Sequence, residues 1–360
     1  MRIVQLIPTL NRGGAEKLAV NLANGLAAKN EVIFITLFDE SDWNENNFKC
    51  ELDNNIKFIS LNKRLGLDFK IFFKLLKLII NLKPNVVHNH LASFNYLIPT
   101  IILLSNKVKF FHTIHNDSFK ENNNYFTYIT RKFFFKNHYV KPITISKSSK
   151  ESFTRQFNLD SNLIENAIIK PKLNVDNSIK DLFLNLKSTY KKIFINIGRF
   201  APQKNQLALI EAFKDKGLED YCLLIIGGGR LDPELDEKIK LINSPNVYLL
   251  GELDNPQDYL INCDAFVLSS IFEGLPITLI ESLSLGIPVI STKVGGIPDI
   301  IKEDYNGFLF EEINTNSFIN KFKELGDYDF NSLKNNCIET YNDKFNIQKF
   351  IEKHTEIYQK

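Results

Sequence analysis

Two glutamates eight residues apart are the most informative polar residues of the stretch FEGLPITLIESLSLGIPVI, which covers residues 272–290. Glu281 lies among apolar neighbours such as Ile280 and Leu283, and a buried carboxylate without a partner costs several kcal/mol. Two vicinal hydroxyls, as on a ribose, could donate hydrogen bonds to it, whereas Glu273 on the preceding loop could bind sugar hydroxyls. The alternative is that one of the two glutamates caps the helix or forms a structural salt bridge.

The backbone of two loops is suited to bind an anion. Gly274 and Pro276 shape the loop before Glu281, so that Leu275 and its neighbours can present N–H groups at a helix start. Gly13 and Gly14 offer the same kind of site in TLNRGGAEKLAV. The GxGxxG pattern of dinucleotide-binding proteins is missing, and a plain turn between strand and helix is the alternative at these two glycines.

Two cations follow a strand in the stretch IGRFAPQKN. Arg199 and Lys204 leave its C-terminal end five residues apart, which would let them clamp a diphosphate and offset its charge as it departs. A pair of solvated surface charges explains the spacing equally well. No DxD pattern follows a strand.

The arrangement of apolar runs indicates the fold class. Short β-branched runs alternate with helical patterns over nearly the whole chain, which is typical of α/β units around parallel sheets. We predict two doubly wound domains, residues 1–170 and 171–343, and a C-terminal helix over 344–360 that packs back on the first domain. Ligands of such sheets bind beyond the carboxyl ends of the strands, here in a cleft between the domains. Six strands are expected in each domain, at 2–7, 31–37, 56–60, 85–88, 108–113 and 141–145, and then at 191–200, 221–229, 246–251, 264–270, 287–292 and 307–310. An irregular linker is expected over 166–190.

Composition excludes several classes of protein. The 360 residues are 44% hydrophobic and 24% charged, as in an ordinary globular protein. The four cysteines lie far apart, which argues against zinc and redox motifs and favours a cytoplasmic location. MRIVQLIP lacks the features of a signal peptide, and every apolar run is shorter than the roughly 20 residues that span a bilayer.

Charge is distributed unevenly along the chain. Residues 1–165 carry 22 Lys and Arg against 14 Asp and Glu, and the remaining residues carry 22 against 28. The basic first half fits a domain that meets an anionic surface or substrate. No nucleic-acid partner is expected.

These motifs together resemble one protein family. GGAE at 13–16, GRFAPQKN at 198–205, the pair Glu273 and Glu281, and GGIPDII at 295–301 occur in the order and spacing of the retaining glycosyltransferases of family 4. The likeness extends over essentially the whole chain. It implies the GT-B fold, in which two Rossmann-like domains face each other across a cleft, and a nucleotide-sugar as substrate without a metal cofactor.

The resemblance also implies roles for single residues. Arg199 and Lys204 would bind the donor diphosphate and stabilise the leaving group, Glu273 would contact the donor sugar, and Glu281 would bind the ribose. Family analogy favours uridine diphosphate as the carrier. Transfer would retain the anomeric configuration by a front-face route, in which the leaving phosphate helps remove the acceptor's proton. The other donor-binding positions would be Gly14, Gly274 and Leu275.

Histidines of the first domain complete the predicted site. In FHTIHND the residue that matches the family is His115, which would face the sugar near the reacting carbon after the fifth strand. His112 lies inside that strand and is expected to be structural. His90 and Glu16 would line the acceptor site. We expect His88 and His90 after the fourth strand, with a structural role for His88 and no zinc, because no third ligand is nearby.

Two stretches of the basic half bear on the acceptor. Residues 63–83 place Phe72, Leu75, Leu76 and Ile79 on one helical face among lysines, and residues 131–141 mix aromatics with cations. Such composition suits a helix at an anionic membrane surface, and equally suits a helix packed on a sheet. A polyprenyl-diphosphate-linked saccharide acceptor and a peripheral membrane location follow from the first interpretation.

Two other functions share this architecture. A nucleotide-sugar epimerase also pairs Rossmann-like domains, but the glutamate pair and the cation pair favour transfer. A non-catalytic subunit that binds sugar nucleotides would show donor binding without turnover.

Overall fold

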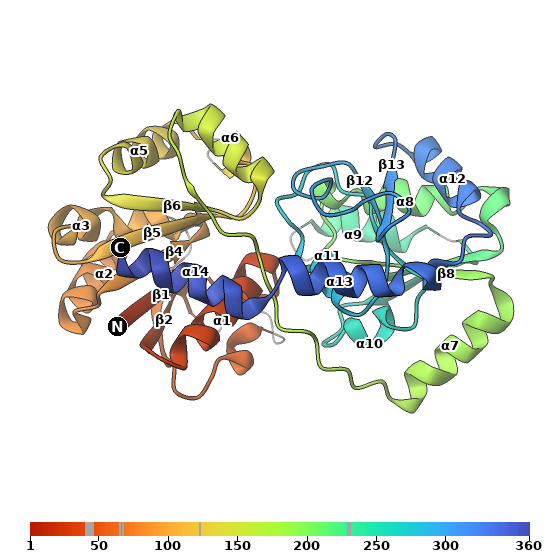
Figure 1. The fold of residues 1–360 in the computed structure, drawn as a ribbon, viewed down its shortest axis with the longest axis horizontal. Coiled ribbons are helices and arrows are strands. Elements are labelled where there is room, and N and C mark those ends of the chain that lie inside the picture. Colours follow the sequence, from red (N-terminus) through yellow and green to blue (C-terminus); the bar gives the residue numbers. More distant parts are fainter. Residues whose placement is uncertain (40–46, 65, 67, 122–123, 229–231, 243) are drawn as a thin grey trace. The chain divides into compact units, whose positions relative to one another are not determined.

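The computed structural model describes residues 1–39, 47–64, 66, 68–121, 124–228, 232–242 and 244–360 (Figure 1). The chain divides into two compact units. The first consists of Met1–Ile169 with Asn346–Lys360, and the second of Lys170–Phe345.

The first unit is built on a seven-stranded parallel sheet with the order β3-β2-β1-β4-β5-β6-β7. The order reverses between β1 and β4, which is the topological switch point of a doubly wound fold. The strands are β1 (Arg2–Ile7), β2 (Glu31–Phe38), β3 (Lys57–Lys63), β4 (Val86–His90), β5 (Lys109–Ile114), β6 (Val140–Thr144) and β7 (Asn162–Leu163). The two-residue strand β7 was not predicted, because it is too short to give a periodic signal.

Side chains alternate between the two faces of this sheet. Val4, Val87 and Phe110 belong to one core cluster with apolar residues of α2, α3, α5 and α6. The opposite face carries polar residues in register, because Gln5 pairs with His88 and His90 pairs with Thr113. The helices are α1 (Gly14–Ala27), α2 (Phe69–Leu82), α3 (Phe94–Leu104), α4 (Ser118–Glu121), α5 (Tyr125–Lys136) and α6 (Lys147–Phe157).

The C-terminal helix α14 (Ile347–Gln359) belongs to this first unit and packs against α1. Phe350, His354 and Tyr358 are its buried residues, at the i, i+4 and i+8 positions that form one face of a helix. The ring of Tyr358 lies 4.9 Å from that of Phe111 on β5, so α14 covers the sheet face that carries the polar residues.

The second unit contains a six-stranded parallel sheet with the order β10-β9-β8-β11-β12-β13. Its order reverses between β8 and β11. Both sheets therefore have the Rossmann-like, doubly wound arrangement that the sequence predicts. The strands are β8 (Lys192–Ile197), β9 (Tyr221–Ile226), β10 (Val247–Gly251), β11 (Ala265–Leu268), β12 (Val289–Thr292) and β13 (Gly307–Phe310).

The helices of the second unit include one in the predicted linker. Helix α7 (Asn177–Thr189) begins at the side chain of Asp176, which caps it, and buries Ile179, Phe183 and Leu186. The expectation of an irregular linker over all of 166–190 is therefore wrong. The other helices are α8 (Gln206–Ala212), α9 (Pro233–Lys240), α10 (Gln257–Leu260), α11 (Ile277–Ser284), α12 (Thr315–Glu324) and α13 (Lys334–Lys344).

None of the helices in the described part of the chain has the length and apolar content needed to cross a membrane.

Candidate active site

Four of the predicted donor-binding residues lie on two loops at one edge of the second sheet, namely Arg199, Lys204, Gly274 and Leu275. Strands β8 and β11 are parallel neighbours, so the loops that follow them, residues 198–205 and 269–276, start at the same edge. This edge lies at the switch point between the two halves of the sheet, where doubly wound folds bind ligands.

An ion pair joins the two loops. Nζ of Lys204 lies 2.6 Å from Oε1 of Glu273, and Oγ of Ser270 donates a hydrogen bond to the same oxygen at 2.7 Å. The side chain of Glu273 is 7% exposed and that of Lys204 is 20% exposed. Within the described residues, no hydrogen bond reaches Oε2 of Glu273, so this oxygen can accept a hydrogen bond from a hydroxyl of a bound molecule.

Further hydrogen bonds fix the backbone around this pair. The backbone N–H of Ile271 donates to the carbonyl of Gln203 at 2.8 Å, and the Gln203 amide donates to the carbonyl of Phe272 at 2.9 Å. The side chain of Gln206 donates to the carbonyl of Arg199 at 3.0 Å. The Lys204–Glu273 geometry is therefore set by the backbone of both loops.

Gly295 allows a third segment to approach the glutamate loop. Its φ is +57°, and a Cβ at this position would lie 1.9 Å from the carbonyl oxygen of Glu273. The backbone N–H of Gly296 donates to the carbonyl of Gly274 at 2.7 Å. The two glycines of GGIPDII thus hold the loop of Glu273 from the opposite side, a function that the sequence alone did not indicate.

Most of the remaining predicted donor-binding residues lie close to this pair in sequence. Arg199 is exposed on the loop after β8. Leu275 is buried, and Glu281 lies in the second turn of α11 with 6% of its surface exposed, as its apolar neighbours predict. Gly14, on the first unit, is the first residue of α1 and follows the extended residue Gly13.

The first unit brings two of the predicted histidines together. Nδ1 of His90 lies 3.1 Å from Nε2 of His115. His115 directly follows β5, whereas His88 and His90 lie within β4, so the expectation that both come after the fourth strand is wrong. Burial lowers the pKa of His115 to about 3 and lowers the pKa of His90, so both rings are neutral at pH 7. Glu16, the other predicted acceptor residue, lies in the first turn of α1.

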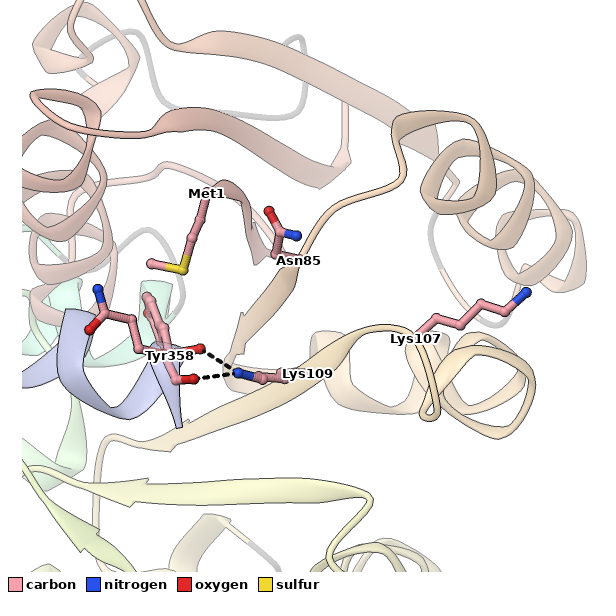
Figure 2. Close-up of a pocket in the computed structure, with 6 residues that line it drawn as sticks. Met1, Asn85, Lys107, Lys109 and Tyr358 are labelled. Atoms are coloured by element: carbon pink, nitrogen blue, oxygen red, sulfur yellow. Dashed lines mark hydrogen bonds between the residues drawn. The ribbon is translucent and has the colours of Figure 1, made fainter.

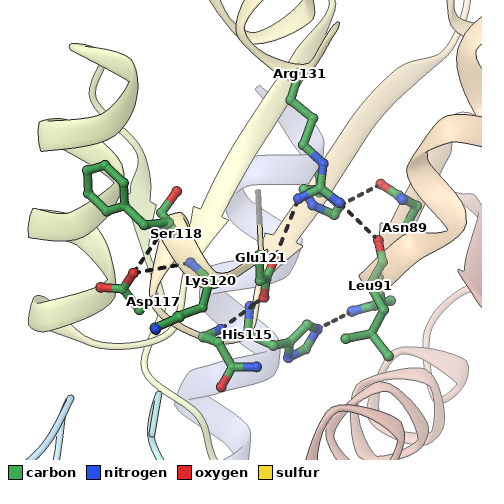
Figure 3. A network of polar contacts seen from close by, with 12 residues as sticks. Asn89, Leu91, His115, Asp117, Ser118, Lys120, Glu121 and Arg131 are labelled. Carbon is green, nitrogen blue, oxygen red and sulfur yellow. Dashed lines mark hydrogen bonds and ion pairs between the residues drawn. The ribbon is translucent and has the colours of Figure 1, made fainter. Parts of the chain in front are cut away.

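A buried ion pair holds the backbone of His115. Oε1 of Glu121 accepts hydrogen bonds from the N–H groups of His115 at 2.6 Å and Asn116 at 2.9 Å, as Figure 3 shows. Nη1 of Arg131 lies 3.5 Å from Oε2 of Glu121, and its Nη2 donates to the carbonyl of Leu91 at 3.4 Å. Burial raises the pKa of the Glu121 carboxyl, whereas Arg131 acts in the opposite direction. The sequence did not point to Glu121 or Arg131, because neither lies in a recognisable motif.

The two stretches considered for membrane contact show both an inner and an outer apolar face. In α2, Leu75 and Ile79 are buried and Phe72 is partly buried, so the predicted face packs on the core. A second stripe points outward, since Phe69 is 67% and Phe73 is 74% exposed. Helix α5 exposes a similar stripe of Phe126, Ile129 and Phe133, which are 67%, 46% and 54% exposed.

Among the residues that the structure describes, no three His, Cys, Asp or Glu side chains are grouped so that they could hold a metal ion.

Family comparisons divide the chain in the same places. Residues 12–168 match the protein family described as "Glycosyltransferase Family 4", and residues 178–341 match the family described as "Glycosyl transferases group 1".

Comparison with individual proteins gives relatives over most of the chain. An uncharacterized glycosyltransferase of Methanocaldococcus jannaschii is 32% identical over 84% of this chain and 88% of its own. The UDP-Gal:alpha-D-GlcNAc-diphosphoundecaprenol alpha-1,3-galactosyltransferase of Escherichia coli is 27% identical over 81% of this chain and 79% of its own. The crystal structure of HepE of Anabaena in complex with UDP and glucose superimposes with a TM-score of 0.81 at 16% identity, over 100% of this chain and 99% of that one. The last likeness concerns the fold.

Proposed function

Because this chain belongs to family 4 of the glycosyltransferases, we propose that it moves a sugar from a UDP-sugar to a saccharide carried on polyprenyl diphosphate. The product would be an intermediate of polysaccharide or glycan assembly. Transfer would retain the anomeric configuration and need no metal ion.

The observation that carries this proposal is the pair of Lys204 and Glu273. Its ammonium and carboxylate lie 2.6 Å apart on loops at the switch point of the second sheet. A cation at this edge offsets the charge of a departing diphosphate. A carboxylate with one oxygen held by Lys204 and Ser270 and the other open is suited to accept a hydrogen bond from a sugar hydroxyl.

The other donor contacts follow the same assignment. Arg199 would pair with the diphosphate beside Lys204, and the backbone of Gly274 and Leu275 at the start of α11 would bind an anionic oxygen. Glu281 would accept hydrogen bonds from the ribose hydroxyls. On the first unit, Gly14 would offer its N–H to phosphate and His115 would contact the transferred sugar.

The lipid-linked acceptor is supported by a relative and by charge. The Escherichia coli relative is named for an acceptor on diphosphoundecaprenol. Residues 1–165 of this chain carry 22 Lys and Arg against 14 Asp and Glu, which favours an anionic diphosphate acceptor. Glu16 and His90 would lie on the acceptor side.

Retention by a front-face route is the simplest mechanism for these residues. We assign Glu16 to acceptor binding and assign no carboxylate of the first unit as a covalent nucleophile. The donor's β-phosphate oxygen would instead take the proton of the acceptor hydroxyl as the bond from the anomeric carbon to that phosphate breaks. The new bond forms on the same face, so configuration is kept, and Arg199 and Lys204 offset the charge on the diphosphate.

Membrane contact would follow from the outward stripes of α2 and α5. Phe69 and Phe73 on α2 and Phe126 and Phe133 on α5 are more than half exposed, next to lysines such as Lys70. Exposed aromatics among cations are suited to the interface of an anionic bilayer, where the lipid-linked acceptor would be found.

The test is a thermal-shift series with UDP, GDP, ADP and TDP in buffer containing EDTA, on the wild type and on Glu281→Ala. A ligand at about 100 times its dissociation constant adds roughly 2.7 kcal/mol of stability, so the correct carrier should stand out. We expect a shift with UDP that is lost in the variant. A shift with another diphosphate would replace UDP as the carrier, and no shift with any of the four would contradict the donor assignment.

Transfer itself needs a second measurement. Incubation with UDP-sugars and a short-chain polyprenyl-diphosphate saccharide should give an elongated product whose new linkage is read by NMR. Products from the donor alone, without an acceptor, would indicate epimerisation instead. Donor binding without any transfer would favour a binding subunit.

A further inference from the structure

A continuous chain of hydrogen bonds connects His115 to the C-terminal helix. From His115 it passes to His90 at 3.1 Å, and from Nε2 of His90 to Oε1 of Gln5 at 2.9 Å. Nε2 of Gln5 lies 3.5 Å from the hydroxyl of Tyr358, which lies 2.5 Å from Nδ1 of His88. Nε2 of His88 then reaches Oγ1 of Thr113 at 2.7 Å.

The sheet explains why these groups meet. Gln5 is in register with His88, and His90 with Thr113, so all four side chains lie on the face that α14 covers. Figure 2 shows Lys109 at the end of that helix, where its Nζ donates to the carbonyls of Tyr358 at 3.1 Å and Gln359 at 2.7 Å. A cation that bonds the last carbonyls of a helix fixes its end, and thereby the position of the Tyr358 ring.

The orientation of Gln5 at the Tyr358 hydroxyl sets the direction of the chain. Nε2 of Gln5 faces the hydroxyl oxygen, which leaves the one hydroxyl proton for the contact of 2.5 Å with Nδ1 of His88. The hydroxyl oxygen therefore accepts from Gln5, which turns its NH2 group toward Tyr358 and its carbonyl oxygen toward His90.

The orientation of Gln5 fixes the protons on both histidines. An amide oxygen only accepts, so Nε2 of His90 carries a hydrogen. In a neutral ring Nδ1 is then an acceptor, and Nε2 of His115 must donate to it. Burial keeps these rings neutral, since the pKa of each lies well below its ordinary value.

We propose that Tyr358 is a positioning residue that holds His115, through Gln5 and His90, in the tautomer with hydrogen on Nε2. His115 then keeps an unprotonated Nδ1, which accepts a hydrogen bond from a hydroxyl of the substrate. The second statement rests on the proposed function, whereas the first concerns the protein alone. Of the two histidines that this hydrogen-bond network joins directly, His115 is 7% exposed and His90 is 1% exposed. The network therefore opens to solvent at His115.

The experiment is 15N NMR of the ring nitrogens in protein labelled at histidine, at pH 7.5, for the wild type and Tyr358→Phe. In the wild type we expect hydrogen on Nε2 of His88, His90 and His115. His354 is an internal reference with hydrogen on Nδ1, because that nitrogen contacts the carbonyl of Phe350 at 2.9 Å. In Tyr358→Phe, Gln5 loses the partner that orients it, and His115 should show both tautomers.

Two further variants make the test decisive. Thr355→Val removes another hydroxyl of α14, which donates to the carbonyl of Ile351 in the same helix at 2.8 Å, and should leave the spectrum of His115 unchanged. Gln5→Met interrupts the chain of hydrogen bonds but leaves residue 358 a tyrosine. It should give the same mixture of His115 tautomers, and it remains a test if Tyr358→Phe fails to fold. Hydrogen on Nδ1 of His115 in the wild type, or a single tautomer in both interrupted variants, would overturn the proposal.

Activity adds a readout that separates this proposal from the proposed function. Tyr358→Phe should lower kcat about fivefold to tenfold, the effect of one misdirected hydrogen bond, with KM for the donor unchanged. If the spectra agree with the tautomers above and no sugar nucleotide is a substrate, the proposed function fails and the tautomer assignment stands. A normal kcat with the mixed spectrum would contradict the substrate contact of His115.

Discussion

The ammonium of Lys204 and the carboxylate of Glu273 form an ion pair 2.6 Å long between residues that are 69 positions apart in the sequence. Glu273 is 7% exposed, so little water screens its charge. Removing one partner of such a pair leaves the other as an uncompensated charge, whereas a neutral isostere of Glu273 keeps a hydrogen-bond acceptor for Lys204. This distinction allows catalysis and folding to be tested separately.

Glu273→Gln should lower kcat about 100-fold, because the amide cannot stabilise charge on the transferred sugar as a carboxylate does. The dissociation constant for UDP should remain roughly unchanged, since the proposed contacts of Glu273 are with the sugar. Steady-state kinetics and titration calorimetry measure the two effects. Glu211→Gln is the control, because it removes a carboxylate from an exposed ion pair of 2.7 Å with Lys214. Loss of UDP binding together with activity in Glu273→Gln would assign a different role to this residue.

Gly295→Ala should destabilise the second unit and lower activity with it. The added Cβ would lie 1.9 Å from the carbonyl oxygen of Glu273, and backbone atoms cannot move aside as a flexible side chain can. Gly251→Ala is the matched control, since Gly251 also has a positive φ, +70°, but, apart from its chain neighbours, no atom of the described residues lies within 4 Å of its Cβ position. The control should cost about 1 kcal/mol of unfolding free energy, the strain of a left-handed alanine, and Gly295→Ala clearly more. An equal loss of unfolding free energy in the two variants, measured by urea titration, would mean that the loop of Glu273 can move aside at little cost.

The sequence predicted most of the fold because parallel strands leave a strong local signal. The twelve expected strands correspond to β1–β6 and β8–β13, with ends that differ by a few residues. Helix α7 was missed because only Ile179, Phe183 and Leu186 mark its buried face among many polar residues. The sequence placed Lys204 and Glu273 on loops that follow strands but did not predict their ion pair, because only the structure shows that β8 and β11 are neighbours.

Residues that act on the site through the backbone gave no such signal. Glu121 binds two N–H groups near His115, and Ser270 bonds to Glu273, but only the three-dimensional structure places them there. The link from Tyr358 to Gln5 joins positions 353 residues apart and depends on how α14 packs. Periodicity and spacing carry no information about such contacts, because they arise from tertiary packing.

Replacement of both Phe69 and Phe73 by Ser should weaken membrane binding without unfolding the protein, because the two rings are 67% and 74% exposed. Burying one such ring in a bilayer interface is worth about 1.5–3 kcal/mol, so the loss of two should lower partitioning at least tenfold. Flotation with vesicles that contain anionic lipid measures the effect. Leu241→Ser, at an 81% exposed position of the second unit, is the control. Wild-type protein that floats equally well with neutral and with anionic vesicles would contradict the proposed contact. So would wild-type protein that floats with neither kind.

The buried histidines predict that stability falls as the pH is lowered below about 6.5. In the unfolded chain a histidine takes up a proton near pH 6.5, whereas burial lowers the pKa of His115 to about 3 and that of His354 to about 4 in the folded protein. Between these values only the unfolded state is protonated, so acid favours unfolding, and each of the two residues should cost about 2 kcal/mol at pH 5 relative to pH 8.

Urea titrations at pH 8, 6.5 and 5 measure this dependence. His354→Gln removes one titrating group from α14, so its unfolding free energy should fall less between pH 8 and pH 5 than that of the wild type, by about 2 kcal/mol. His138→Gln is the control, because His138 is exposed, and its variant should follow the wild-type curve. Parallel curves for the wild type and His354→Gln would mean that His354 takes up its proton in the folded protein, and that α14 opens to solvent in mild acid.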